Sequence, residues 1–155
     1  MKKSLVLLLA VVGILSCSNQ KSGFVYDIPV LIEKNFDDIS TILSKDKACT
    51  AFNREEPTSL ILKTFGNEWV NSFSKDAYTL DINFDYKSRV VQNIFLSTND
   101  PSGTTNDFNK LLRAGNLIMN NTKYKCEFYN SLAKYYSSTP TDKGRYTGIL
   151  VTKLK

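Results

Sequence analysis

Catalytic chemistry has few candidate residues here, because the 155-residue sequence contains no histidine. Serine or cysteine nucleophiles activated by histidine are therefore excluded, and so are zinc sites built on imidazole. The pattern Ser-x-x-Lys begins at Ser18, Ser44, Ser72 and Ser131, but the companion motifs Ser-Asp-Asn and Lys-Thr-Gly of serine–lysine enzymes are absent. We therefore predict a protein that is not an enzyme and has no cofactor.

One segment matches the start of a calcium-binding loop. Asp81, Asn83 and Asp85 are spaced as the first three ligands, yet Tyr86 replaces the required glycine and Gln92 the final glutamate. Strand alternation explains the same residues as the solvent-facing side of a strand. No metal site is predicted.

Cys17 has the most informative surroundings of the three cysteines. Residues 1–3 (Met-Lys-Lys) form a positively charged start, and residues 4–15 are apolar except for Ser4 and Gly13. Ser16 then places a small residue before Cys17, as in a secretory signal peptide. The apolar run is too short for a transmembrane helix, which needs about 20 residues.

The sequence Ile14-Leu15-Ser16-Cys17 resembles the lipobox of bacterial lipoproteins. The resemblance implies cleavage before Cys17, acylation of Cys17, and a membrane anchor made of lipid. Residues 1–16 are then the signal peptide, residues 17–24 the lipidated cysteine and a polar tether, and residues 25–155 a single domain. A plain secreted chain and an uncleaved anchor are the alternatives.

The residues after Cys17 indicate where in the cell envelope the protein is expected to be located. Ser18 stands where aspartate implies retention at the inner membrane in the enterobacterial sorting rule, so the resemblance implies the outer membrane. Ser18–Lys21 lacks the acidic run of surface-exported lipoproteins, which favours the periplasmic face.

Cys49 and Cys126 leave two alternatives open. An even pair of cysteines in an oxidising compartment can form a disulfide, worth roughly 4–5 kcal/mol on the chain-entropy model. They can equally be separate thiols, since Cys126 alternates with Tyr124 and Phe128 as a core-facing strand residue does.

Aromatic residues are the main candidates for a binding surface. Trp69, Tyr135, Tyr136 and Tyr146 can supply a face that is apolar on one side and wet on the other. Core packing is the alternative, above all for Trp69. Tyr135 and Tyr136 are adjacent and precede a polar loop, so at least one of them is expected to face solvent.

The net charge of +5 is spread along the chain without a cluster of four or more Lys or Arg. Nucleic acid is therefore not an expected partner. A weak attraction to anionic lipid or polysaccharide is compatible with this charge.

A helix and a three-stranded meander are predicted in the first half. Asn35 can cap a helix ending near residues 44–47, with Asp37 and Asp38 in its first turn. Strands are predicted at 69–73, 78–86 and 90–97, because apolar and polar residues alternate there. Pro29 predicts an extended start to residues 27–32, while residues 48–65 fit helix or strand.

A second helix and two further strands are predicted in the second half. The helix begins at Thr105 or Asn106, after a turn at residues 100–103, and ends with Gly115 as its C′ residue. Strands are predicted at 124–129 and 146–154, while residues 131–136 are ambiguous. The resulting fold class is α+β, with two short helices packed on an antiparallel meander of four to six strands.

The segment from Asn35 to Val91, with Glu68-Trp69 and residues 78–84 (Tyr-Thr-Leu-Asp-Ile-Asn-Phe), resembles β-lactamase-inhibitor-protein-like lipoproteins, including outer-membrane assembly lipoproteins. It departs from them at Lys34, where glycine commonly opens the helix, and at Lys45-Asp46, where Gly-x-Pro commonly follows. The chain also looks like short lipoproteins of Bacteroidetes-type bacteria. These resemblances imply helices on a meander and a binding role.

The leading functional hypothesis is an envelope lipoprotein that acts as a non-enzymatic protein-interaction module. The expected partners are the membrane, through the lipid, and an envelope protein. The alternative is a small-ligand or glycan binder that uses an aromatic face.

Overall fold

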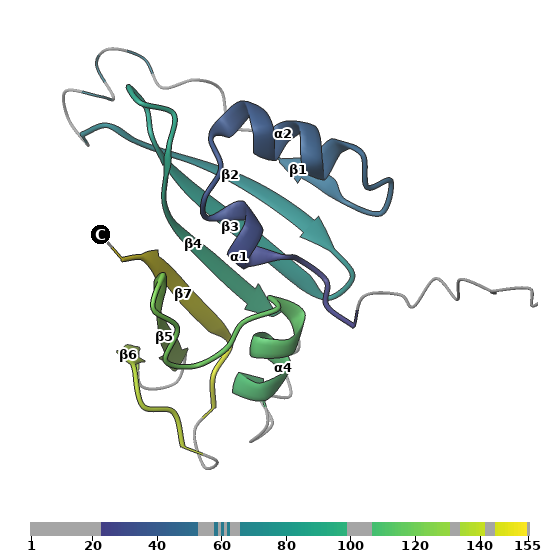
Figure 1. Cartoon of the computed structure of the whole chain (residues 1–155), viewed down its shortest axis with the longest axis vertical. Coiled ribbons are helices and arrows are strands. Elements are labelled where there is room, and N and C mark those ends of the chain that lie inside the picture. Colours follow the sequence, from purple (N-terminus) through teal and green to yellow (C-terminus); the bar gives the residue numbers. More distant parts are fainter. Residues whose placement is uncertain are drawn as a thin grey trace, which may run out of the picture.

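One antiparallel sheet of seven strands organises the domain (Figure 1). The computed structural model describes residues 23–52, 58, 60, 62, 66–98, 107–130, 134–141 and 145–154. Across the sheet the strand order is β1-β2-β3-β4-β7-β5-β6. The strands are β1 (Thr50–Phe52), β2 (Glu68–Lys75), β3 (Tyr78–Asp85), β4 (Val91–Thr98), β5 (Tyr124–Asn130), β6 (Tyr135–Ser137) and β7 (Gly148–Lys153).

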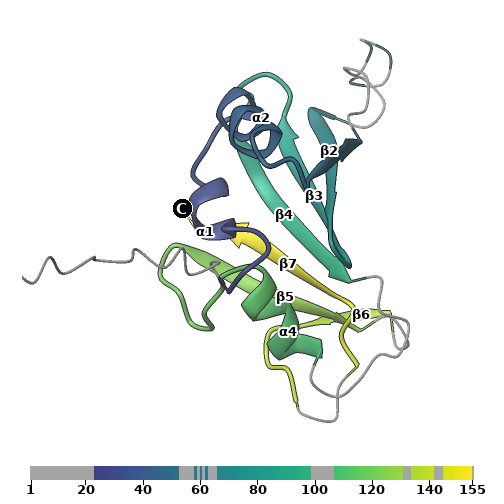
Figure 2. The same ribbon diagram turned by 90° about the vertical axis from the view of Figure 1, so that its right-hand side faces the viewer.

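The helices pack on one face of this sheet. They are α1 (Ile28–Leu31), α2 (Phe36–Ser44) and α4 (Asp107–Ala114). In Figure 2 they lie along the same side of the strands, with α1 and α2 over the first half and α4 over the second. Their buried side chains join the core-facing strand residues in a single hydrophobic cluster. The predicted α+β class is therefore confirmed, with more strand than helix.

The helix predicted from Asn35 is present as α2. The side chain of Asn35 accepts a hydrogen bond from Asp38 N–H at 2.9 Å, which satisfies a free donor of the first turn. Ile39 and Leu43 are buried against the sheet, as the helical spacing of apolar residues predicts.

The predicted meander is also present, as β2, β3 and β4. Trp69 lies opposite Phe84, Asn71 opposite Ile82, and Phe73 opposite Leu80. Residues directly opposite one another share a face, so the register places all of these side chains beneath the helices. The β2–β3 turn is shorter than predicted, because β2 continues to Lys75 and only residues 76 and 77 separate the strands.

Three predicted details of the fold are wrong. Residues 28–31 are helical, not extended, because Pro29 occupies the first turn, where its missing N–H costs no hydrogen bond. The sheet has seven strands, not four to six, because β1 and β6 have three residues each and show little alternation. The helix α1 also raises the helix count from the predicted two to three among the described residues.

The end of α4 also differs from the prediction in one residue. Asn116, with φ 53°, takes the left-handed conformation that was predicted for Gly115, and Leu117 N–H donates to Leu112 O at 2.8 Å. Gly115 has a packing role instead: a Cβ there would come within 2.9 Å of Ile28 Cδ1 and Leu117 Cδ1.

Some predicted elements lie partly outside the described residues. The start of α4 at Thr105 or Asn106 and the turn at residues 100–103 are among these. Of the ambiguous segment 48–65, Leu60 and Leu62 are helical, and Leu62 N–H donates to Thr58 O at 3.0 Å. Cys17 and the tether up to residue 22 also fall outside.

Candidate binding surface

The face of the sheet opposite the described helices carries a row of aromatic side chains. Phe95 on β4, Tyr129 on β5 and Tyr136 on β6 share this face, because their register partners alternate with the core-facing residues. The ring centroids of Phe95 and Tyr129 are 6.3 Å apart, and those of Tyr129 and Tyr136 are 5.0 Å apart. We call these three residues the aromatic row.

Gly148 on β7 allows the side chain of Phe95 on β4 to contact that of Tyr129 on β5. The strand β7 lies between β4 and β5, so a side chain there would separate Phe95 from Tyr129. A Cβ built on Gly148 would come within 2.7 Å of Phe95 Cε2. The Phe95 ring therefore lies over the glycine, and the edge of the ring reaches Tyr129 at an interplanar angle of 74°.

Polar side chains border the aromatic row on the same face. Ser72 donates to Asp81 Oδ1 at 2.5 Å, and Ser74 and Thr79 are hydrogen-bonded at 3.2 Å. Near the other edge, Lys125 Nζ lies 2.9 Å from Glu127 Oε1. An apolar centre with a polar rim is the composition of a protein-binding surface.

The structure places Tyr135 and Tyr136, two of the predicted binding residues, on opposite faces of β6. Tyr136 is 49% exposed and belongs to the aromatic row, whereas Tyr135, 48% exposed, lies on the other face of the same strand. Phe95 and Tyr129 were missed by the sequence reasoning. Their alternation with the core residues Ile94 and Phe128 was the available signal, but it does not reveal which faces remain uncovered.

Trp69 packs in the core, which is the alternative that the sequence favours for it, and not on an exposed binding surface. It is 5% exposed and stacks on Phe36 of α2 with ring centroids 4.4 Å apart. The guanidinium of Arg89 lies 4.6 Å from the Phe36 ring centroid and 5.6 Å from that of Trp69. The indole therefore anchors α2 to the sheet.

Tyr146 is likewise buried, at 2% exposure, so core packing is the alternative that holds for this residue. Its ring packs edge-on against Phe108 of α4 and Phe128 of β5. Its hydroxyl accepts a hydrogen bond from Thr141 N–H at 3.2 Å. It holds α4 and the loop before β7 to the core.

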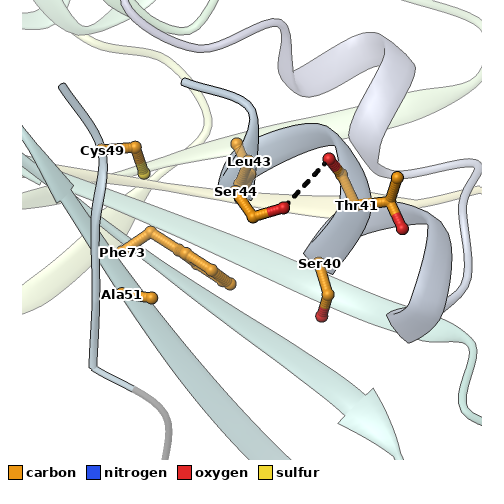
Figure 3. A pocket seen from close by; sticks show the side chains of 7 residues that line it. All are labelled: Ser40, Thr41, Leu43, Ser44, Cys49, Ala51 and Phe73. Carbon is orange, nitrogen blue, oxygen red and sulfur yellow. Dashed lines mark hydrogen bonds between the residues drawn. The ribbon is translucent and has the colours of Figure 1, made fainter. Parts of the chain in front are cut away.

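Apart from the aromatic row, a hollow between α2 and β1 is a further candidate site (Figure 3). It has a volume of about 320 Å³, and Ser40, Thr41 and Ser44 of α2 face Cys49, Ala51 and Phe73 across it. Burial raises the pKa of the Cys49 thiol, so the neutral form is favoured. A neutral thiol is a weak nucleophile, and none of the other described lining residues is an acid or a base.

Cys49 and Cys126 are free thiols, which settles the two alternatives for this pair. Cys49 directly precedes the edge strand β1, while Cys126 lies on β5, five strand spacings across the sheet. At about 4.8 Å per spacing, this far exceeds the Cα separation of roughly 7 Å that a disulfide tolerates. Burial raises the pKa of Cys126 to about 11.

Among the described residues no group of three or more His, Cys, Asp and Glu side chains could hold a metal ion. Within the same part of the chain, no helix has the length and apolar character needed to cross a membrane. No family model matches the sequence, and no curated protein or solved structure shows significant similarity to it.

Proposed function

We propose that this chain is a lipid-anchored protein of the bacterial envelope whose domain binds a protein partner without catalysing a reaction. The observation that carries the proposal is the aromatic row, Phe95, Tyr129 and Tyr136, on the face opposite the helices. Tyrosine and other large aromatic residues dominate the binding energy of protein interfaces. The polar rim supplies hydrogen-bonding groups around them.

The start of the described chain fits this use of the sheet. The domain begins beside the end of α4, where the N–H groups of Val25 and Tyr26 both donate to Ala114 O, at 2.9 and 2.8 Å. The chain therefore enters on the helix-covered side of the sheet. Residues 23–26 therefore do not cover the aromatic row, which lies on the opposite face and can contact a partner.

The proposed anchor has its own test in cells. Replacing Cys17 by Ala removes the acylation site, so the variant is expected to be lost from the outer-membrane fraction and to keep its signal peptide uncleaved. Immunoblots of fractionated cells measure both effects. A Cys17→Ala protein that is processed normally and remains in the outer membrane would reject the lipoprotein proposal. The Cys126→Ala variant is the control, since its thiol is buried in the domain.

The proposed binding role is tested by alanine substitution in the aromatic row. The Tyr129→Ala and Tyr136→Ala double variant is expected to weaken capture of the envelope partner by about 30-fold or more, because interface hot spots contribute about 2 kcal/mol or more. The matched control is Tyr135→Ala, an equally exposed tyrosine on the other face of β6. Equal capture by both variants contradicts the proposal.

A glycan ligand is the second candidate, because three neighbouring rings lie on one face of the sheet, with successive centroids 6.3 and 5.0 Å apart. Sugar rings stack on exposed aromatic side chains through their apolar faces, and a row of rings can contact successive sugars. Titration with envelope polysaccharide fragments separates the two candidates. Saturable binding that the same double variant abolishes would favour the glycan.

A further inference from the structure

The strand β5 has an open edge over about half of its length. β6 pairs only with Phe128, Tyr129 and Asn130 of β5. β7 pairs with Tyr124–Tyr129 on the opposite side. On the β6 side, residues 124–127 therefore have no strand beside them in the described part of the chain. After Ser137 the chain turns, and Thr139 N–H donates to the Ser137 hydroxyl at 3.2 Å.

The backbone of Cys126 points out of this edge. Lys123 O accepts from Leu154 N–H at 2.9 Å, and Tyr129 O accepts from Thr147 N–H at 3.1 Å, so both carbonyls face the β7 side. Backbone groups alternate in direction along an antiparallel strand. Odd-numbered residues of β5 thus face β7, while the N–H and C=O of Cys126 face away, with no backbone partner among the described residues.

A shallow groove runs beside the open edge. Its volume is about 180 Å³, and its lining includes Met119, Cys126, Ser138 and Leu154. The apolar members of this lining can receive a side chain that points toward the helix-covered face. Asn120, Asn121 and Lys125 add polar groups to the same lining. Unpaired backbone groups beside a groove that offers apolar contacts are the features that bind an extended peptide as an added strand.

The other side of the same edge carries alternating charge. Lys125 and Glu127 lie on the face of the aromatic row, on either side of Cys126 in sequence, and form an ion pair of 2.9 Å. An antiparallel peptide meets Glu127 first and Lys125 last. The charges therefore favour a peptide with a basic residue, then an apolar residue, then an acidic residue.

A second copy of the chain fits this edge poorly. Pairing Cys126 with Cys126 of the second copy would place the other chain's Tyr124 opposite Phe128, where Ser137 already lies. Pairing Cys126 with Tyr124 of the second copy would place Lys125 opposite Lys125, and like charges directly opposite are unfavourable. The occupant that the edge favours is therefore a segment of a different protein.

We infer that an extended segment of the partner protein adds to β5 as an antiparallel strand, with its central apolar residue hydrogen-bonded to the backbone of Cys126. This inference rests on the proposed function, because the added strand would continue from the surface that bears Tyr129 and Tyr136. It names what the partner presents: a short strand of alternating charged and apolar residues.

The experiment uses a peptide joined to the full-length chain. Leu154 lines the groove, so a Lys-Val-Glu-Thr segment, which spans only the open residues 124–127 of β5, is fused after Lys155 through a Gly-Ser linker of about eight residues, which spans roughly 16 Å. Tethering raises the effective concentration to the millimolar range. Hydrogen exchange by NMR should show the Cys126 amide slowed by about tenfold or more relative to the unfused chain.

The matched control replaces the valine of the fused segment by proline, which removes the donor that would face Cys126. Its Cys126 amide should exchange as fast as in the unfused chain, while the Glu127 amide, which faces β7, should be unchanged in both fusions. Equal exchange of the Cys126 amide in the valine and proline fusions overturns the inference. Slowed exchange in the valine fusion, with partner capture indifferent to the aromatic row, would reject the proposed function and keep the added strand.

Discussion

At the scale of single residues, the aromatic row depends on the absence of a side chain at Gly148. The Phe95 ring occupies the space that a Cβ would need. The aromatic row thus needs a residue without a side chain on β7, which is Gly148. It also needs aromatic side chains on the other strands, β4, β5 and β6.

Gly148→Ala is expected to destabilise the domain by about 1–3 kcal/mol, because the new methyl group displaces a packed ring. Urea unfolding of the single variants and of the Gly148→Ala, Phe95→Ala double variant measures the coupling. In the double variant the methyl group has room, so its cost should largely disappear. Strictly additive losses would show that the ring does not lie over Gly148.

The ion pair of Asp46 with Lys75 should make stability depend on pH. Lys75 Nζ lies 2.6 Å from Asp46 Oδ2, and Ala48 N–H donates to Oδ1 at 3.0 Å. The hydrogen bond from Lys75, followed by that from Ala48, lowers the pKa of Asp46. The folded pKa thus lies below the unfolded value of about 3.9. The stabilisation is present above this value and is lost as pH falls through the folded pKa.

Asp46→Asn removes that pH dependence. The gap in Tm between wild type and variant should be present at about pH 7 and should narrow as the pH falls below the unfolded pKa of about 3.9. The effect is small, since the Asp46 side chain is 39% exposed and water screens the pair. Lys75→Met should flatten the profile in the same way. A gap that stays constant across this range would contradict the assignment.

At the scale of elements, α2 is held to the meander by one turn residue. Arg89, in the turn between β3 and β4, stacks on Phe36 and bonds Asp37 Oδ1 at 3.0 Å, while its carbonyl accepts from Phe36 N–H at 2.9 Å. The turn and the start of the helix therefore fix each other. Neither the helix nor the hairpin shows this from its own sequence.

Arg89→Ala is expected to cost about 1–2 kcal/mol, from the lost cation–π and charge-assisted contacts. Arg89→Gly should cost less, because glycine adopts the φ of 58° without the penalty that alanine incurs. Thermal unfolding of the three proteins measures the order. Equal Tm values for wild type and Arg89→Ala would mean that the stacked guanidinium contributes nothing.

Sequence periodicity predicted the long elements and failed for the short ones. The alternation from Tyr78 to Tyr86 and the cap at Asn35 are local signals, so β3 and α2 were predictable. β1 and β6 have three residues each, too few for alternation to register, and depend on pairing with distant strands. Asn71 shows the same limit: it is polar, yet it is fully buried opposite Ile82.

The candidate site was less predictable than the fold for a related reason. A tyrosine at an alternating position is core on one face and surface on the other, and only the placement of the helices decides between them. Tyr124 and Tyr136 illustrate this, since Tyr124 on β5 is buried in the core and Tyr136 on β6 is half exposed. Exposure of an aromatic residue is therefore a property of the assembled layers.

At the scale of the whole molecule, the sheet separates two roles. One face carries the helices, the hydrophobic core and the point where the chain enters, and the opposite face carries the aromatic row. Under the proposed function, this division leaves the face of the aromatic row to a protein partner. The central claim is that the partner contacts the face of the aromatic row.

Site-specific photocrosslinking in cells tests that claim most directly. A benzoylphenylalanine at Tyr136 is compared with one at Val30, which is 45% exposed on α1 of the opposite face. The account predicts one identified envelope protein crosslinked from position 136 and not from position 30. Tyr129→Ala should abolish the crosslink, and the purified protein should bind the domain directly. Equal crosslinking from both positions, or crosslinking from position 30 alone, would contradict the account.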